Sequence, residues 1–272
     1  MTINSSPSRT GNFTSSGIAP LTTKGKQALG FDVPAITYIE EKKMERRLGR
    51  SIKTESNARP LAWGKMMERY VFDQLGTEYT LTSDVTDIHP IIPYWSGSKD
   101  GLKRRPNKAV IDMKCPMTLK SFCQLVDPIY DGLEGIEAMN AVRDNHKSGE
   151  DYYWQLVSNA ILNDVEYAEL IIFMPYLSEI PAIRQLADGN SAMYWLTYAE
   201  DDYIPYLIDG GYYQNINKIF FKVPQADKDF LTSRVELAGQ LLLPKAALSY
   251  TFDRVNDQPV IIVEKNKKPE LI

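Results

Sequence analysis

Hydrophobic positions along the chain follow two periods, one typical of helices and one typical of strands. The helical period predicts helices at 37–49, 59–76, 118–126, 132–146, 151–164 and 225–243. Pro60 falls in the first turn of the second helix and Gly76 at its end, where each residue type is favoured. Asp151 is the expected N-cap of the fifth helix, because its carboxylate can accept hydrogen bonds from free backbone N–H groups.

Strands are predicted at 77–83, 108–116, 166–176 and 217–224, and 89–95 is expected to be a short extended piece. Segment 77–83 alternates between polar and apolar residues, whereas 166–176 is apolar along most of its length. A continuous apolar strand is typical of a sheet that helices cover on both faces. Strands interleaved with helices predict an α/β (α+β) fold with a mixed central sheet flanked by helices.

The amino-terminal residues differ in composition from the rest of the chain. Ten of the first 23 are Ser or Thr, and Arg9 is the one charged residue among them. Such a segment cannot bury enough apolar surface to offset the entropy of ordering it, so a disordered tail is expected at 1–25. A single domain is expected over 26–250, followed by a carboxy-terminal extension at 251–272.

The overall composition is that of a soluble globular protein. Of the 272 residues, 43% are hydrophobic and 24% are charged, which is ample material for a core. No apolar run is long enough to span a bilayer, and the amino terminus lacks the basic-then-apolar order of a secretory signal. We therefore expect a cytoplasmic protein without a membrane partner.

Cysteine and histidine are too few for two classes of site. Cys115 and Cys123 cannot form a disulfide framework or a four-ligand zinc site, and two histidines cannot form a histidine-rich metal centre. The formal net charge of −4 argues weakly against a nucleic-acid partner. Basic residues are nevertheless concentrated at 40–53 and 99–108, so a local phosphate-binding surface is not excluded.

Charged residues inside the apolar segment 108–116 are the main functional signal. Asp112 and Lys114 are two residues apart, so both side chains point to the same face of the predicted strand. Their burial is costly unless they pair or bind a ligand. Asp100 lies in a Gly-flanked turn before this strand, and Glu68 lies on helix 59–76 among aromatic residues and methionines. Both acids are candidates to join the pair.

Three carboxylates and a lysine are groups that metal-assisted phosphodiester hydrolysis requires. Carboxylate oxygens suit Mg²⁺, for which Mn²⁺ is expected to substitute. The cation would polarise the phosphoryl group, and the lysine would orient or help deprotonate the attacking water. Two simpler interpretations remain open. Asp112 and Lys114 could form an ordinary ion pair at a strand end, and Glu68 could pair with Lys65 on the helix surface.

In their order along the chain, these residues resemble the PD-(D/E)xK nuclease signature. GSKDGL at 97–102 corresponds to the turn that carries the first acid, and DMKCP at 112–116 to the (D/E)xK strand. WGKMMERYVF at 63–72 and YYWQLVSNAIL at 152–162 are similar to the Gly-x-x-x-Glu and Tyr-x-x-Gln helices of the lambda-exonuclease-like, YqaJ-type viral recombinase family. The similarity covers roughly residues 55–245.

The resemblance implies a restriction-endonuclease-like core and a role for each matched residue. Glu68, Asp100 and Asp112 would surround the metal, Lys114 would lie at the nucleophile, and Gln155 would position water or substrate. Asp112 stands where glutamate is commoner, so its carboxylate reaches about one methylene less far. No functional group that the chemistry requires is missing.

A nuclease also needs contacts to DNA. The expected contact residues are Lys99, Lys103, Arg104, Arg105 and Tyr152, because the cations could bind phosphates and the tyrosine could contact substrate. Lys99 stands where the family has proline, which leaves the turn less rigid but adds a cation. Alternatively, the basic residues form a solvated face and Tyr152 serves only in packing.

The sequence therefore predicts a Mg²⁺-dependent deoxyribonuclease. By resemblance it is an exonuclease that processes duplex DNA ends for phage-type recombination in a bacterial host cell, with DNA and a single-strand annealing protein as partners and a toroidal homo-oligomer as its assembly. Two alternatives remain. One is an endonuclease of the same superfamily, restriction-like or repair-like; the other is a module on a nuclease fold that binds DNA or protein without cutting it.

Overall fold

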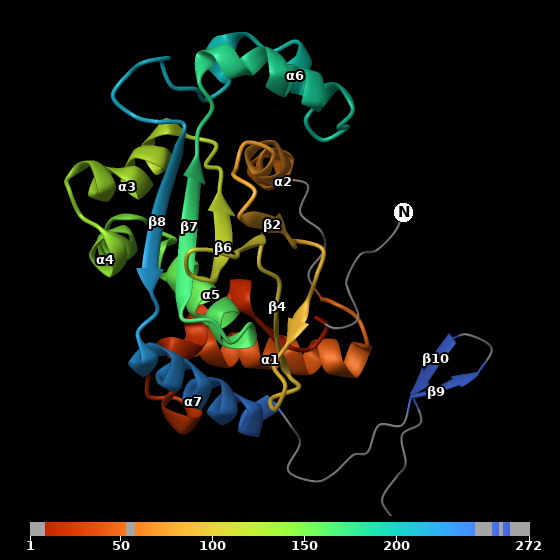
Figure 1. Ribbon diagram of the computed structural model, residues 1–272. Coiled ribbons are helices and arrows are strands. Elements are labelled where there is room, and N and C mark those ends of the chain that lie inside the picture. Colours follow the sequence, from red (N-terminus) through yellow and green to blue (C-terminus); the bar gives the residue numbers. More distant parts are fainter. Residues whose placement is uncertain (1–8, 53–57, 243–251, 256–257, 262–272) are drawn as a thin grey trace, which may run out of the picture.

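A five-stranded mixed sheet forms the centre of the molecule, with strand order β2–β5–β6–β7–β8 (Figure 1). Its strands are β2 (Tyr79–Leu81), β5 (Gly101–Lys103), β6 (Ala109–Lys114), β7 (Tyr167–Phe173) and β8 (Ile216–Lys222). The β6–β7 pair is parallel and the other three pairs are antiparallel. The computed structural model describes residues 9–52, 58–242, 252–255 and 258–261. The predicted mixed α/β sheet is confirmed.

Helices pack around this sheet. In the described residues they are α1 (Val33–Leu48), α2 (Arg59–Phe72), α3 (Leu119–Tyr130), α4 (Gly135–Asn145), α5 (Gly149–Leu162), α6 (Ile180–Asp188) and α7 (Gln225–Leu242). Short 3-10 helices lie at Ser15–Gly17, Ala19–Thr22, Ala28–Gly30, Leu177–Glu179, Tyr194–Thr197 and Asp201–Tyr203. The segment that contains α6 extends beyond the end of β7 (Figure 1), and the sequence pattern did not predict this helix.

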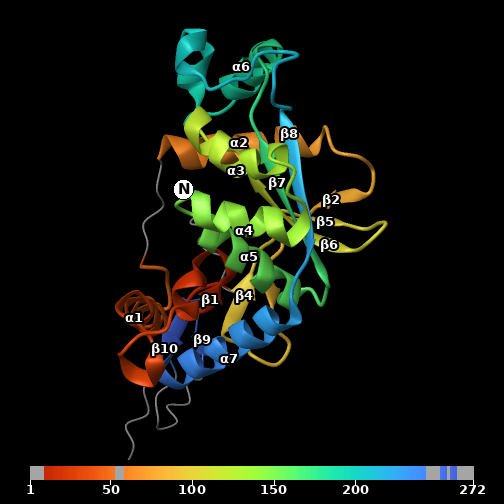
Figure 2. The same ribbon diagram turned by 90° about the vertical axis from the view of Figure 1, so that its left-hand side faces the viewer.

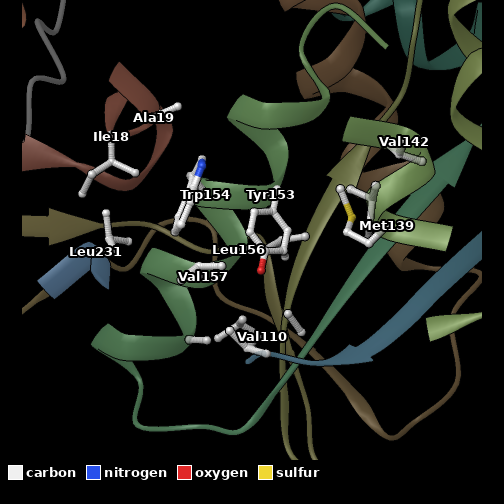
Figure 3. Close-up of a cluster of buried hydrophobic side chains, with 14 of the residues drawn as sticks. Ile18, Ala19, Val110, Met139, Val142, Tyr153, Trp154, Leu156, Val157 and Leu231 are labelled. Atoms are coloured by element: carbon white, nitrogen blue, oxygen red, sulfur yellow. The ribbon is translucent and has the colours of Figure 1, made fainter. Parts of the chain in front are cut away.

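Apolar residues form two clusters, one on each face of the sheet. On one face Val110 packs with residues of α3, α4 and α5, among them Tyr153 (Figure 3), and these three helices lie on the same side of the sheet (Figure 2). On the other face Ile111 packs with Trp63 and Met67 of α2. Strand β7 is buried from Ala168 to Phe173. Both faces are therefore covered, as the apolar run 166–176 predicted.

Two local predictions are wrong. Helix α5 begins at Gly149 after Ser148, so Asp151 lies in its first turn and does not cap it. Its charge still favours the positive end of the helix dipole. Within the segment 89–95, residues 89–94 form a turn instead of an extended piece, because Nδ1 of His89 accepts hydrogen bonds from the backbone N–H groups of Ile91 and Ile92, and Trp95 begins β4.

The predicted disordered tail at 1–25 is wrong for residues 9–25. Strand β1 (Phe13–Thr14) pairs with β4 (Trp95–Gly97), which also pairs with β3 (Asp87–Ile88) in a small second sheet. Phe13, Ile18 and Leu21 are completely buried. Residues 1–8 of the predicted tail lie outside the described residues.

A buried arginine of α7 explains how so polar a segment is held. Arg234 donates hydrogen bonds to the backbone oxygens of Leu21, Thr23 and Gly30, and its guanidinium lies 3.9 Å from the centre of the Phe31 ring. The backbone carbonyl groups of this polar segment, whose burial would be unfavourable without partners, therefore accept hydrogen bonds from a charged donor. The segment is ordered by contacts from a helix about 200 residues away.

The carboxy-terminal part of the chain is described only in two short strands. β9 (Phe252–Val255) and β10 (Gln258–Ile261) pair with each other in antiparallel order. The other residues of the predicted extension at 251–272 lie outside the described residues. Among the described helices, none is both long and apolar enough to cross a membrane.

Replacing Phe13 by alanine tests whether the amino-terminal segment belongs to the core. We expect Phe13→Ala to lower the free energy of unfolding by about 3–5 kcal/mol, because it removes a fully buried aromatic side chain. Urea unfolding, with the slope compared between variants, measures this loss.

Tyr203→Ala is the matched control, since that aromatic ring is 72% exposed. Its free energy of unfolding should change by no more than about 0.5 kcal/mol. If Phe13→Ala matched this control, residues 9–25 would not be part of the folded core.

Candidate active site

Strand β6 carries a buried ion pair at its carboxyl end. Asp112 has no exposed surface, and its Oδ2 lies 2.6 Å from Nζ of Lys114. Gln155 of α5 donates from Nε2 to Asp112 Oδ1 at 2.6 Å, and its Oε1 accepts from Lys114 Nζ at 3.4 Å. Both strand residues face α5, as their spacing predicted, and the three side chains form a closed ring of contacts.

Helix α5 brings two of the expected site residues to this pair. Tyr152 and Gln155 are three residues apart, so they lie on the same face of the helix. The Tyr152 ring centre lies 4.6 Å from Lys114 Nζ, within the range of a cation–π interaction. Tyr152 therefore contacts the lysine, and the structure does not test its expected contact with DNA.

Asp100 reaches the site from the turn before β5. Its Oδ2 accepts the backbone N–H of Met113 at 2.6 Å, and its own N–H donates to the backbone oxygen of Ile111 at 3.1 Å. These two bonds hold the turn against β6, with Asp100 beside the residue that follows Asp112. The antiparallel β5–β6 pairing explains why acids twelve positions apart become neighbours.

Glu68 comes from α2, on the opposite face of the sheet from α5. Trp63, Met67 and Val71 are the buried side of this helix, and they leave Glu68 half-buried at its edge. Burial raises the pKa of Glu68, and the carboxylate of Asp112 raises it further. The acid is therefore close enough to the ion pair to sense its charge.

The site holds more negative than positive charge. Burial raises the pKa of Asp100 well above its ordinary range, and the carboxylate of Asp112 raises it further. Burial alone would lower the pKa of Lys114, but Asp112 and Asp100 raise it above its ordinary value, so the lysine is an ammonium ion. Three acids thus share the buried Lys114, with Lys65 acting on Glu68 alone, and such an excess of acids favours either proton uptake or a bound cation.

The available donor atoms suit a hard divalent ion. Within the described residues, no three His, Cys, Asp or Glu side chains are arranged as a complete metal site. Mg²⁺ does not require one, because it commonly takes one or two carboxylates and completes its shell with water and substrate oxygens. Asp112 Oδ2 is buried without a hydrogen bond of regular geometry. With Asp100 beside it and Glu68 nearby, this oxygen could hold such an ion.

The structure separates the expected DNA-binding cations from the site. Lys99 is buried and its ammonium pairs with Asp87 at 2.6 Å inside the fold, and a contact with phosphate stays a prediction. Lys103 pairs with buried Glu169 at 2.7 Å and lies beside Ala109, at the opposite end of β6 from Lys114. Its ammonium is engaged in that ion pair, and a contact of this partly buried residue with DNA also stays a prediction.

Arg104 and Arg105 are exposed in the loop between β5 and β6. That loop precedes Ala109, so it lies about 17 Å along the strand from Lys114. A DNA contact at these residues stays a prediction.

One residue beside the site was missed by the sequence analysis. His146 stacks on Tyr152 with ring centres 5.5 Å apart and donates to Ser121 of α3. It follows the last turn of α4, and a single histidine after a helix carries no signal in the sequence. Only the packing of α3, α4 and α5 brings it behind Lys114.

Comparison with known proteins shows a fold and no close relative. No family model matches the chain, and no curated protein matches it significantly. An alkaline exonuclease, LHK-Exo, from Laribacter hongkongensis shares 17% identity over 86% of this chain and 89% of its own, with a TM-score of 0.50. A phage-related exonuclease from Haemophilus somnus 129PT shares 12% identity over 85% and 93%, with a TM-score of 0.54. The predicted nuclease-type α/β fold is confirmed.

Replacing Asp100 tests the excess of negative charge. A raised pKa means that the folded protein binds this proton more tightly than the unfolded chain does, so ionisation destabilises the fold. In chelator, wild-type stability should fall as the pH rises from the ordinary aspartate pKa through the raised one. Asp100→Asn keeps an oxygen acceptor for Met113 N–H, and it should raise Tm at neutral pH.

The pH dependence of Tm in chelator, measured by thermal unfolding, checks this expectation. Asp144→Asn is the control, because it neutralises an exposed carboxylate on α4, away from the ion pair of β6. A lower Tm in Asp100→Asn than in wild type at neutral pH would contradict the charge excess.

Proposed function

We propose that the protein is a Mg²⁺-dependent deoxyribonuclease, and more specifically an exonuclease that acts on duplex ends. The observation that carries this proposal is the convergence of Asp112, Lys114 and Gln155 at one end of β6, with Asp100 beside them. An ordinary surface ion pair would need neither the glutamine nor two further acids nearby.

The comparisons support the same reaction class. Both structures of similar fold are named exonucleases, and a further structure of LHK-Exo holds dAMP; it shares 17% identity over 87% of this chain and 90% of its own, with a TM-score of 0.50. A shared fold does not fix an activity. The proposal therefore depends on the side chains at the end of β6, and the fold adds to it.

The residues of the site divide the work of hydrolysis. A divalent ion bound by Asp100 and Asp112 would supply a Lewis acid to the phosphoryl oxygen. Lys114, a charged donor held between Asp112 and Gln155, would orient the attacking water and stabilise negative charge on the phosphate. The Gln155 amide would keep Asp112 in place, and Glu68 would hold water at the edge of the site.

A wider role follows only from the resemblance. The proposed setting is the processing of duplex ends in phage-type recombination, with a single-strand annealing protein as partner and a toroidal homo-oligomer. An endonuclease of the same superfamily is the second candidate, because the same carboxylates and lysine serve both modes of cleavage.

Cleavage of two DNA substrates separates these functions. End-labelled linear duplex and closed circular plasmid are each incubated with the protein in Mg²⁺, in Mn²⁺ and in chelator. We expect loss of the linear DNA alone, in either metal and not in chelator, because an exonuclease needs an end and the reaction needs the ion.

Nicking of the circle would support the endonuclease. Binding of both substrates without cleavage would replace the nuclease with a binding module. Mg²⁺ should also raise the Tm of the wild-type protein and have a smaller effect on Asp100→Asn, which provides a test of metal binding independent of turnover.

Substitution of the ion pair tests the assignment of roles. Asp112→Asn and Lys114→Ala should each lower kcat by about 100-fold or more, because the first removes a charged ligand of the divalent ion and the second removes the cation that acts on the water and the phosphate. Turnover of labelled linear duplex at saturating Mg²⁺ measures the loss, with folding confirmed by circular dichroism.

Lys108→Ala is the control for a lost cation, since Lys108 is exposed in the loop before β6. It should retain wild-type kcat. Folded Asp112→Asn or Lys114→Ala protein with wild-type turnover would remove that residue from the mechanism.

A further inference from the structure

A side-chain stack next to Lys114 has no role in the reaction proposed above. Tyr152 contacts the Lys114 ammonium through its ring, and the same ring stacks on His146 at an interplanar angle of 25°. His146 is 4% exposed. Lysine, tyrosine and histidine thus form a continuous series of contacts from the end of β6 to the region between α3 and α4.

The hydrogen bonds of His146 fix both its orientation and its proton. Nδ1 accepts the backbone N–H of Ser148 at 3.2 Å, so in the neutral ring the proton is on Nε2. Nε2 lies 2.7 Å from Oγ of Ser121 and therefore donates to it. Since the hydroxyl accepts this bond, His146 is not a base for Ser121, and the two residues do not form a nucleophilic pair.

Burial agrees with a neutral ring, because it lowers the pKa of His146 and the neighbouring Lys147 lowers it further. The imidazole is thereby held by α3 through Ser121, by the end of α4 through its own backbone, and by the start of α5 through Ser148. A ring fixed in this way is a rigid support for Tyr152.

Besides the Tyr152 ring, Lys114 has one short polar contact and one long one. The ammonium contacts Asp112 at 2.6 Å, whereas its distance to Gln155 is 3.4 Å, near the limit of a hydrogen bond. A lysine side chain has high rotamer entropy, and one short contact does not fix its four torsions. The Tyr152 face adds a second contact, a cation–π interaction at 4.6 Å from the ring centre.

We propose that His146 is a positioning residue for Lys114, which it fixes beside Asp112 by holding the Tyr152 ring in place. The inference rests on the function proposed for Lys114 and assigns no contact between His146 and substrate. It predicts that the histidine affects turnover more than substrate binding.

Two substitutions of His146 test the proposal in the full-length protein. His146→Ala should lower kcat on linear duplex in Mg²⁺ by about 10-fold and change KM by less than about two-fold, since the lost support is equivalent to one cation–π contact. His146→Phe keeps a ring against Tyr152 and should restore most of the lost kcat.

The other histidine of the chain provides a matched control. His89 also stacks on an aromatic ring, that of Trp95, at 5.1 Å, and its Nδ1 also accepts backbone N–H groups. It lies in the turn before β4, and within the described residues its ring contacts are with Trp95, Ile91 and Ile92 and not with Lys114 or Tyr152. His89→Ala should lower Tm but leave kcat unchanged. Equal losses of kcat in His89→Ala and His146→Ala, at equal Tm, would overturn the proposal.

A spectroscopic measurement separates this inference from the nuclease assignment. The ε-methylene resonance of Lys114, in protein labelled with [ε-¹³C]lysine and assigned by Lys114→Arg, reports the ring current of Tyr152. It should shift in His146→Ala and stay in place in His89→Ala. If the wild-type protein cuts no DNA but the Lys114 resonance shifts in His146→Ala, the nuclease assignment alone is refuted. Unchanged kcat and unchanged resonance in His146→Ala would refute the positioning role alone.

Discussion

The carboxylate of Asp112 is completely buried at the end of a central strand, and the rest of the site is arranged around that charge. A buried ion without partners is strongly unfavourable, so the fold must supply both a counter-charge and hydrogen bonds. Lys114 provides the first from the same strand, and Gln155 provides the second from α5. The position of α5 against β6 is therefore set by polar contacts as well as by apolar packing.

The two faces of the sheet contribute different parts of the site. The face covered by α3, α4 and α5 holds Asp112, Lys114 and the side chains that support them. Glu68 comes from α2 on the other face, and Asp100 comes from the turn at the edge between them. Because these elements meet at one end of β6, the carboxylates accumulate there without enough cations to balance them. That imbalance is the physical basis for proposing a metal-dependent reaction.

The same structure shows why charge along the sequence is a weak guide to a binding surface. Lys99 and Lys103 belong to the basic segment 99–108, yet both neutralise acids within the fold. A lysine near such a motif can either bind phosphate or pair with an acid inside the fold, and the local sequence is the same in both cases. Its exposure, which depends on residues such as Asp87 and Glu169 far along the chain, decides between them.

The sequence by itself determined strands β2, β6, β7 and β8 of the central sheet and most helices, because their hydrophobic periods are local properties of the chain. It also determined that Asp112 and Lys114 share a face, since side chains two apart on a strand must do so. Only the tertiary structure decided that residues 9–25 join the core, that Lys99 and Lys103 are engaged in ion pairs, and that His146 lies behind Tyr152. Each of these depends on a contact between distant segments, such as Arg234 with Leu21, and no local period encodes such a contact.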